Sequence, residues 1–189
     1  PVARNDTGTV NEDATLTVSN GDNPNIVAGA SFVDSFDVSG QDTAPQDISF
    51  NNDGTKMFVL GNAGKDVNEY TLSTGFDVST ASFVDSFSVN SQETSPKSIS
   101  FNNDGTKMFI LGSEGDDVNE YTLSTGFDVS TASFVDSFDV SSNASNPQAV
   151  TFNNDGTKMF VTDTFNKNVN EYTLSTGFDV STASYDSNF

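Results

Sequence analysis

The stretch SFNNDGTKMFVLG, residues 49–61, returns twice along the chain with few changes. It reappears as SFNNDGTKMFILG at residues 100–112 and as TFNNDGTKMFVTD at residues 151–163. Aligned on this stretch, the chain contains three 51-residue copies, 31–81, 82–132 and 133–183, of which the first two agree at 40 of 51 positions. Residues 1–30 precede the copies and a partial strand, SYDSNF (184–189), follows them. The chain is therefore a tandem array.

Each copy contains four short segments with the pattern of β-strands and few residues that favour helices. In the first copy these segments are PQDISF (45–50), KMFVLG (56–61), DVNEYTLS (66–73) and SFVDSFDVS (31–39). The Asp-Gly pair of NNDGT predicts a hairpin turn between the first two, with Gly54 at positive φ. KMFVLG has apolar side chains on both faces, which predicts an interior strand covered on both sides.

Four antiparallel strands in a repeat of about 50 residues are typical of β-propeller blades. The pattern P-x-x-[IV]-[ST]-F-N-N-D-G-T-K-M-F-[VI] resembles the hairpin of bacterial propeller repeats of the YVTN and TolB-like kind, where it joins the innermost strand to the second. This resemblance covers residues 31–189 and implies an all-β propeller architecture without implying an activity. A stacked β-solenoid and a β-sandwich are the alternatives, although a sandwich would not need three near-identical units.

Residues 1–30 are interpreted as a separate N-terminal strand or linker segment. The run PVARNDTGTVNEDATLTVSNGDN (1–23) resembles the start of the VCBS and cadherin-like tandem repeats of bacterial surface adhesins, although the remainder of such a domain is missing. The resemblance implies an extracellular or cell-surface location. Because the chain begins with Pro1 and not Met, we expect a processed product or a piece of a longer protein.

The composition excludes several classes of function. The formal net charge of −20 repels nucleic acids and anionic lipids, and the longest apolar runs are too short to span a bilayer. The chain has no cysteine and no histidine, so disulfides, thiol nucleophiles, imidazole bases and the usual zinc sites are absent. Paired carboxylates such as Asp116 with Asp117 have no accompanying base or nucleophile. We therefore expect an acidic protein that is not an enzyme, with no nucleic-acid partner and no membrane insertion.

The differences between copies are confined to two windows, 37–49 and 59–66, and to their equivalents. In propeller strand order both windows lie on one rim of the blades, and the NNDGT turns lie on the other. Loops on a rigid scaffold often carry recognition, so the varied rim is the candidate ligand site; unconstrained drift of loop residues is the alternative. Phe165 in particular could stack on a sugar or fill a pocket of a neighbouring subunit. The candidate contacts are Asp42, Asn62, Lys65, Glu93, Glu114, Asp116, Asn143, Thr164, Phe165 and Lys167.

Asp53, Asp104 and Asp155, one in each NNDGT turn, are candidate calcium ligands because carboxylate oxygens suit this ion. Their spacing differs from that of an EF-hand loop, and Asp at such a turn commonly hydrogen-bonds its own backbone. No cofactor other than calcium is expected.

Three blades do not close a ring, because propellers contain about four to eight. Open edges and apolar blade faces favour association, so we expect a homo-oligomer or filament, or further repeats in a longer chain. In the simplest version two chains form six blades, and segment 31–39 of one completes the last blade of the other in place of SYDSNF. The expected function is an extracellular structural or adhesive module of a bacterial surface or secreted protein. The alternatives are a fibre subunit joined by strand or blade-edge pairing, and a carbohydrate- or peptide-binding propeller that uses the varied rim.

Overall fold

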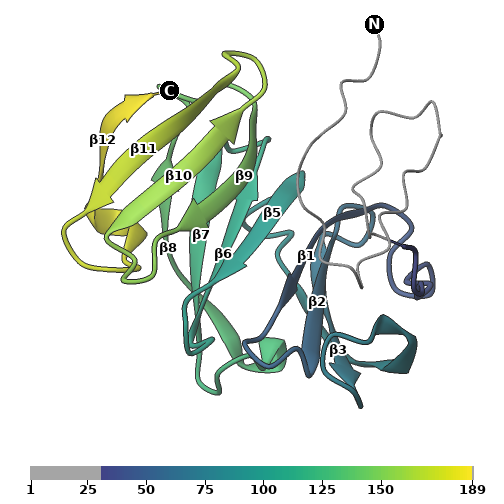
Figure 1. The fold of residues 1–189 in the computed structure, drawn as a ribbon. Coiled ribbons are helices and arrows are strands. Elements are labelled where there is room, and N and C mark those ends of the chain that lie inside the picture. Colours follow the sequence, from purple (N-terminus) through teal and green to yellow (C-terminus); the bar gives the residue numbers. More distant parts are fainter. Residues whose placement is uncertain (1–30, 189) are drawn as a thin grey trace, which may run out of the picture. The chain divides into compact units, whose positions relative to one another are not determined.

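The computed structural model describes residues 31–188, which form three four-stranded antiparallel sheets (Figure 1). Each sheet is a meander whose strands follow chain order, and the sheets are called blades 1, 2 and 3 here. This confirms the expected fold class of tandem antiparallel blades. The strands are β1 (Pro45–Phe50), β2 (Lys56–Gly61), β3 (Asp66–Leu72) and β4 (Ala81–Ser88) in blade 1, β5 (Pro96–Phe101), β6 (Lys107–Gly112), β7 (Asp117–Leu123) and β8 (Ala132–Asp139) in blade 2, and β9 (Pro147–Phe152), β10 (Lys158–Asp163), β11 (Asn168–Leu174) and β12 (Ala183–Asn188) in blade 3.

The chain divides into two units, Pro1–Val33 and Asp34–Phe189, and the second contains every strand named above. The predictions made for residues 1–30 lie outside the described residues. Three short 3₁₀ helices, η1 (Val78–Thr80), η2 (Val129–Thr131) and η3 (Val180–Thr182), precede the outermost strands. None of the helices found in residues 31–188 has the length and apolar character needed to cross a membrane.

The predicted hairpin at NNDGT is confirmed in every blade. In blade 1 the Asp53 carboxylate accepts hydrogen bonds from the Thr55 N–H (3.0 Å) and hydroxyl (2.6 Å), which closes the turn. Gly54 lies at φ 71°, and the Phe76 ring occupies the space that a Cβ at this position would need. The turn therefore requires glycine for two reasons, its backbone angle and the ring packed against it.

The blades pack face to face, and the second strands of blades 1 and 2 are buried on both sides as predicted, whereas β10 of blade 3 is buried on one side only. We call the side of a blade that contacts the next blade its forward face, and the opposite side its rear face. In blade 1 the forward face carries Phe58, Leu60 and Val67, which pack against the rear face of blade 2. The forward face of blade 2 packs in the same way against the rear face of blade 3. The core is thus two interfaces between blades and a smaller cluster on the rear face of blade 1.

Residues 31–39, predicted as an outer strand that would complete a blade of another chain, form no strand in the single chain. Among the described residues, 31–38 belong to none of the sheets, because no strand lies beside them to complete a ladder. The equivalent segments of the later copies form β4 and β8, the fourth strands of blades 1 and 2. The last residues of the chain already form the outer strand of blade 3, because β12 (Ala183–Asn188) pairs with β11. Segment 31–39 therefore cannot simply replace it.

Candidate functional site

The two sequence windows that differ between copies meet on one rim, as expected. In blade 1 the Asn62 N–H donates to the Ala44 carbonyl at 3.0 Å, which joins the β2–β3 loop to the segment entering β1. The Asp42 carboxylate reinforces this junction by accepting from the N–H groups of Ala44 (2.5 Å) and Gly64 (2.6 Å). These hydrogen bonds thus join the two varied windows of blade 1 to each other.

Asp42 and Glu93 are structural residues, which corrects their assignment as candidate ligand contacts. Their exposed fractions are 2% and 1%, and their carboxylates are directed inward to loop N–H groups. Glu93 accepts from the N–H of Ser95 at 2.5 Å and from that of Gly115 at 3.4 Å, the same two positions that Asp42 binds in blade 1. A buried carboxylate needs such partners, and these two therefore hold the loops together.

Blade 3 provides the same carboxylate from a different position in the sequence. Ala144 stands where blades 1 and 2 have Asp42 and Glu93, while Asp163 stands where they have Gly61 and Gly112. The Asp163 carboxylate accepts from the N–H of Asn146 at 3.2 Å and from that of Asn166 at 3.4 Å, which are the equivalent loop donors. In blades 1 and 2 the glycine is required because a Cβ there would collide with the carboxylate. The carboxylate that binds these loop N–H groups thus comes from position 42 or 93 in blades 1 and 2 and from position 163 in blade 3; we call it the exchanged carboxylate.

Phe165 is exposed, at 73%, and presents its ring to solvent. Its N–H donates to Asp163 Oδ1 at 2.9 Å, so the exchanged carboxylate also fixes the backbone beneath this ring. Glu114, Thr164 and Lys167 are exposed as well. Asn62, Lys65, Asp116 and Asn143 are half-buried.

Lys65, Asp116 and Lys167 occupy one turn position rather than one ligand site. They lie at φ 53°, 48° and 59°, just before the third strand of each blade. The carbonyls of the first two accept the hydrogen bonds that end the outer strands, from Val89 (2.9 Å) and Val140 (2.8 Å). Their backbone therefore has a structural role in the blade whatever their side chains contact.

The pKa values of individual carboxylates on the two rims are shifted by hydrogen bonds and by burial. Hydrogen bonds from Thr55, Thr106 and Thr157 lower the pKa of the turn residues Asp53, Asp104 and Asp155 respectively. On the varied rim, burial raises the pKa of Asp66 and Asp117, and bonds from Asn68 and Asn119 oppose that rise. Residues 31–188 contain no group of three or more acidic side chains placed to hold a metal ion. Calcium binding at the turns stays a prediction, testable by a thermal melt with and without chelator.

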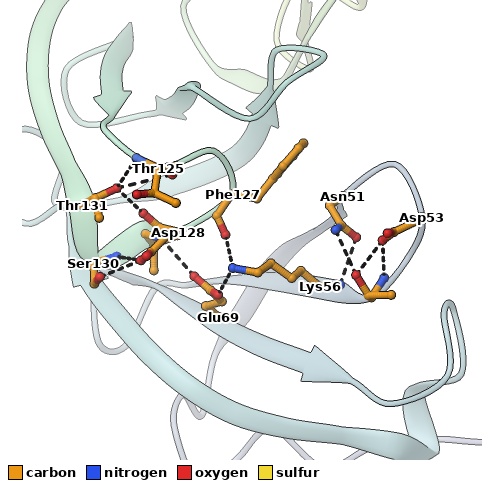
Figure 2. Close-up of polar contacts among 11 residues, drawn as sticks. Asn51, Asp53, Lys56, Glu69, Thr125, Phe127, Asp128, Ser130 and Thr131 are labelled. Carbon is orange, nitrogen blue, oxygen red and sulfur yellow. Dashed lines mark hydrogen bonds and ion pairs between the residues drawn. The ribbon is translucent and has the colours of Figure 1, made fainter.

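A polar clamp between blades was missed in the sequence. Lys56 forms an ion pair with Glu69 at 2.6 Å and donates to the Phe127 carbonyl of the next blade, also at 2.6 Å (Figure 2). The second oxygen of Glu69 accepts from the Val129 N–H at 3.0 Å. Blade 2 repeats these contacts toward blade 3 with its equivalents Lys107 and Glu120, which reach Phe178 and Val180. The invariant lysine and glutamate were the available signal, but their partners are backbone atoms that no pattern identifies.

Three phenylalanine rings accompany each clamp. Phe58 of blade 1 lies 4.6 Å from Phe101 and 6.1 Å from Phe127 of blade 2, measured between ring centroids. The next interface repeats this group with Phe109, Phe152 and Phe178. At the two ends of the array the three equivalent rings are not together in one interface. Blade 1 has the pair Phe50 and Phe76 on its rear face, and blade 3 has the single ring of Phe160 on its forward face.

The two end faces are consequently open. Ile48 on the rear face of blade 1 is 51% exposed, whereas its equivalents Ile99 and Val150 are each 5% exposed inside the interfaces. Beside Ile48 is a cavity of about 300 Å³ with a mainly apolar lining that includes Val38, Met57 and Val59. On the forward face of blade 3, Val169 is 37% exposed while its equivalents Val67 and Val118 are fully buried. These faces are the strongest candidate interaction surfaces of the described residues.

Solved structures with a similar fold include enzymes. The chain is similar to a putative 6-phosphogluconolactonase from Bacteroides fragilis, with 15% identity, a TM-score of 0.54, and coverage of 75% of this chain and 37% of that one. It is also similar to a periplasmic gluconolactonase from Pseudomonas aeruginosa (12%, TM-score 0.53, 77% and 38%) and to the β-propeller domain of Cps50 (Swd1) from Myceliophteria thermophila (9%, 0.52, 77% and 42%). The sequence matches no protein-family model and no curated protein.

These similarities correct the expectation that the chain is not an enzyme. The fold it contains is the fold of proteins named as lactonases, so the architecture gives no ground for setting enzymes aside. At such low identity the likeness extends to the fold and not to a substrate. This chain spans less than half the length of each of those three structures. Its described residues are three blades of a β-propeller.

Proposed function

We propose that this chain is a structural and adhesive module of a bacterial cell surface or secreted protein, which assembles through its two open blade faces. One observation carries the proposal. The forward face of blade 3 and the rear face of blade 1 are the two halves of an interface that the chain already forms twice. A second copy can therefore dock head to tail by the same contacts.

The aromatic residues support this docking. Phe160 is equivalent to Phe58 and Phe109, each of which is fully buried against two rings of the following blade. The pair Phe50 and Phe76 on blade 1 has a centroid separation of 5.5 Å, matching the pairs that receive those rings. Phe160 of one copy would complete the pair of the next copy and fill the adjacent apolar cavity.

The side chains of the polar clamp lie at one end of the array and the backbone groups that they would bind lie at the other. Lys158 and Glu171 lie on the forward face of blade 3, and the backbone groups they would bind, the Phe76 carbonyl and the Val78 N–H, lie on blade 1. Within one chain Lys158 pairs with Glu171 and Asp186, each at 2.7 Å. Docking would redirect a lysine that is already ordered, and it would bury a glutamate that is 21% exposed.

Such an interface is heterologous, since different surfaces of the two copies meet. A rotation that closes after two copies gives a six-bladed ring, and one that does not close gives a filament. Both are structural assemblies. The extracellular location is supported by the resemblance of residues 1–23 to adhesin repeats and by the net charge of −20, which favours solubility and not contact with nucleic acid.

The test is the mass of the assembly in solution, measured by light scattering or native mass spectrometry. The wild-type chain is expected to form a dimer or larger species, while Phe160→Asp and Ile48→Asp are each expected to be monomeric. Ile48 is exposed and Phe160 is half-buried, and both lie on the open faces, so these changes leave the interior interfaces intact. Phe165→Asp, on the rim, is the matched control and should assemble like the wild type.

Mixing the two variants gives the decisive result. Phe160→Asp retains a sound rear face on blade 1 and Ile48→Asp retains a sound forward face on blade 3, so the mixture should form a heterodimer with one good interface. A wild-type chain that stays monomeric at high concentration would overturn the proposal.

A second candidate function is glycan binding on the varied rim. It is favoured by the exposed ring of Phe165, whose backbone is held by Asp163 while the ring faces solvent. Aromatic rings in this position offer a flat apolar surface to a sugar. Binding to a glycan array that disappears in Phe165→Ala and persists in Phe160→Asp would support this function independently of assembly.

A further inference from the structure

The outer strands of blades 1 and 2 combine an open edge with exposed apolar side chains. β4 and β8 are the last strands of their sheets, so within residues 31–188 no strand lies beside their outer edges. Phe83 and Val84 of β4 are 43% and 52% exposed, and their equivalents in β8 are exposed to nearly the same extent. An exposed apolar edge strand is a template for pairing with another chain.

The two edges are also nearly identical in sequence. β4 reads ASFVDSFS and β8 reads ASFVDSFD. A second copy of the chain carries the same two edges, so antiparallel pairing between copies needs no other partner. Such pairing would join the blades side by side and not face to face.

The backbone N–H groups along these strands point alternately toward the third strand of the blade and toward the open edge. The Val89 N–H donates to the Lys65 carbonyl at 2.9 Å and therefore points inward. Ser86 lies three residues earlier in an unbroken register, so its N–H points outward. The same count from the Val140 bond places the Ser137 N–H on the outer edge of β8.

An aspartate in each strand covers this outward N–H. The Asp85 carboxylate accepts from the Ser86 N–H at 2.8 Å, and the Asp136 carboxylate accepts from the Ser137 N–H at 2.8 Å. The carboxylate thus takes the bond that the carbonyl of a neighbouring strand would otherwise accept. It also places a negative charge at the edge, and like charges on paired strands repel each other.

A β-bulge lies directly before the aspartate. Asp85 is opposite Glu69 and Phe83 is opposite Tyr70, so Val84 has no partner in β3. The bulge turns Phe83 toward Tyr70 of its own blade, with ring centroids 5.8 Å apart. β8 repeats this arrangement. A bulge interrupts the regular edge that an added strand would need.

We propose that Asp85 and Asp136 keep the outer edges closed to lateral pairing with other copies of this chain, so that copies join only through their blade faces. Each aspartate acts in two ways, by capping the outward serine N–H and by its charge. Charged residues are placed in this way beside aggregation-prone strands of many proteins. The inference gives the proposed function a direction of assembly, and it rests on that function only for the contact between faces.

The test removes both aspartates in the Phe160→Asp chain, which lacks the face needed for head-to-tail assembly. Asp85→Ala/Asp136→Ala in this background should lose its monomer peak in size-exclusion chromatography with light scattering and form larger species. The control Asp53→Asn/Glu114→Gln removes two exposed carboxylates, one from each rim, and should stay monomeric. A monomeric alanine variant would overturn the inference. Equal association of the control would also overturn it, because the effect would then come from net charge.

This outcome is separable from that of the proposed function. A wild-type chain that is monomeric would overturn the head-to-tail assembly, whereas association of the alanine variant would still support the closed edges.

A milder variant separates the two actions of the aspartate and serves if alanine impairs folding. Asp85→Asn/Asp136→Asn retains an acceptor for the serine N–H but removes the charge. It should associate more than the parent chain and less than the alanine variant. Association equal to that of the alanine variant would overturn the capping role, and no association would overturn the role of the charge.

Hydrogen exchange locates the contact in the associated alanine variant. The Ser86 and Ser137 amides should exchange more slowly there than in the parent monomer, because their outward N–H groups enter a new ladder. Unchanged rapid exchange at both amides would show that the copies associate elsewhere and would overturn the inference.

Discussion

Blades 2 and 3 have nearly the same sequence on their forward faces, but among residues 31–188 only blade 2 has another blade packed there. Phe109 is fully buried, whereas its equivalent Phe160 is half-buried, and Glu120 is less exposed than Glu171. The same side chain therefore contributes differently to stability depending on whether another blade covers it. Identical repeat sequences therefore give the same local structure, while the position of a blade in the array decides how much each side chain contributes to the free energy of unfolding.

The largest expected difference comes from the aromatic ring. Phe109→Ala should lower the free energy of unfolding by about 3–5 kcal/mol, because it empties a packed site between two blades. Phe160→Ala, studied in the monomeric Ile48→Asp background, should cost less than about 1.5 kcal/mol because its ring has packing on one side only. Urea titration of both variants measures the difference. Equal losses would mean that the forward face of blade 3 is covered even in the monomer.

The clamp gives the next largest effect. Glu120→Gln should cost about 2 kcal/mol, because it weakens charged hydrogen bonds to Lys107 and to the Val180 N–H in a buried site. Glu171→Gln should cost less than about 1 kcal/mol in the monomer, because Glu171 and its partner Lys158 are both partly exposed to water. Denaturation in low and high salt checks the assignment, since only the exposed pair should be sensitive to screening.

The exchanged carboxylate allows blade 3 to be converted to the arrangement of blade 1. Asp163→Gly alone should cost about 2 kcal/mol by leaving loop N–H groups without a partner. Adding Ala144→Asp should restore about 1 kcal/mol, so the two changes are coupled and not additive. The four chains of this double-mutant cycle are compared by urea titration. Strict additivity would show that the two positions do not serve the same loop.

The smallest effect at neutral pH concerns the buried tyrosines. Burial raises the pKa of Tyr172 to about 12, and its hydroxyl has no partner among residues 31–188, whereas the Tyr121 hydroxyl donates to Gln92. At pH 7 Tyr172→Phe should change stability by less than about 0.5 kcal/mol.

Alkali separates the variant from the wild type. Above about pH 10 the unfolded state loses its phenolic proton first, so ∂ΔG/∂pH is negative and wild-type stability falls as the pH rises toward 12. Tyr172→Phe should show a shallower fall. Identical alkaline curves for the two chains would place the titrating group elsewhere.

The regular parts of this fold could be predicted from the sequence. The repeat predicted the blades, Gly54 predicted the hairpin, and the apolar residues of KMFVLG predicted a strand covered on both faces. Each of these features depends on local backbone geometry or on a periodic pattern of buried residues. The rim was harder to interpret. Asp42 and Glu93 belong to a variable window and are charged, so they were expected to face solvent, although their partners are loop N–H groups from another segment.

A signal for that burial was present in the reciprocal changes. Where position 42 or 93 is acidic the strand ends in glycine, and where Ala144 replaces the acid the strand ends in Asp163. The clamp left no such trace, because Lys56 and Glu69 are identical in every copy and bind backbone atoms. The open faces could be expected from the number of blades, but the matching aromatic rings on them could be identified only from the packing of the interior interfaces.

The exchanged carboxylate also restricts how such an array can be copied. The identical run FNNDGTKMF lies between the two varied windows, and identical stretches are where genetic recombination between repeats would take place. A crossover there between the third copy and either of the others would join Asp42 to Asp163, placing two acids at one loop, or join Ala144 to Gly112, leaving none. Crossovers between blades 1 and 2 keep one carboxylate at the loop, while blade 3 keeps it only if positions 144 and 163 stay together.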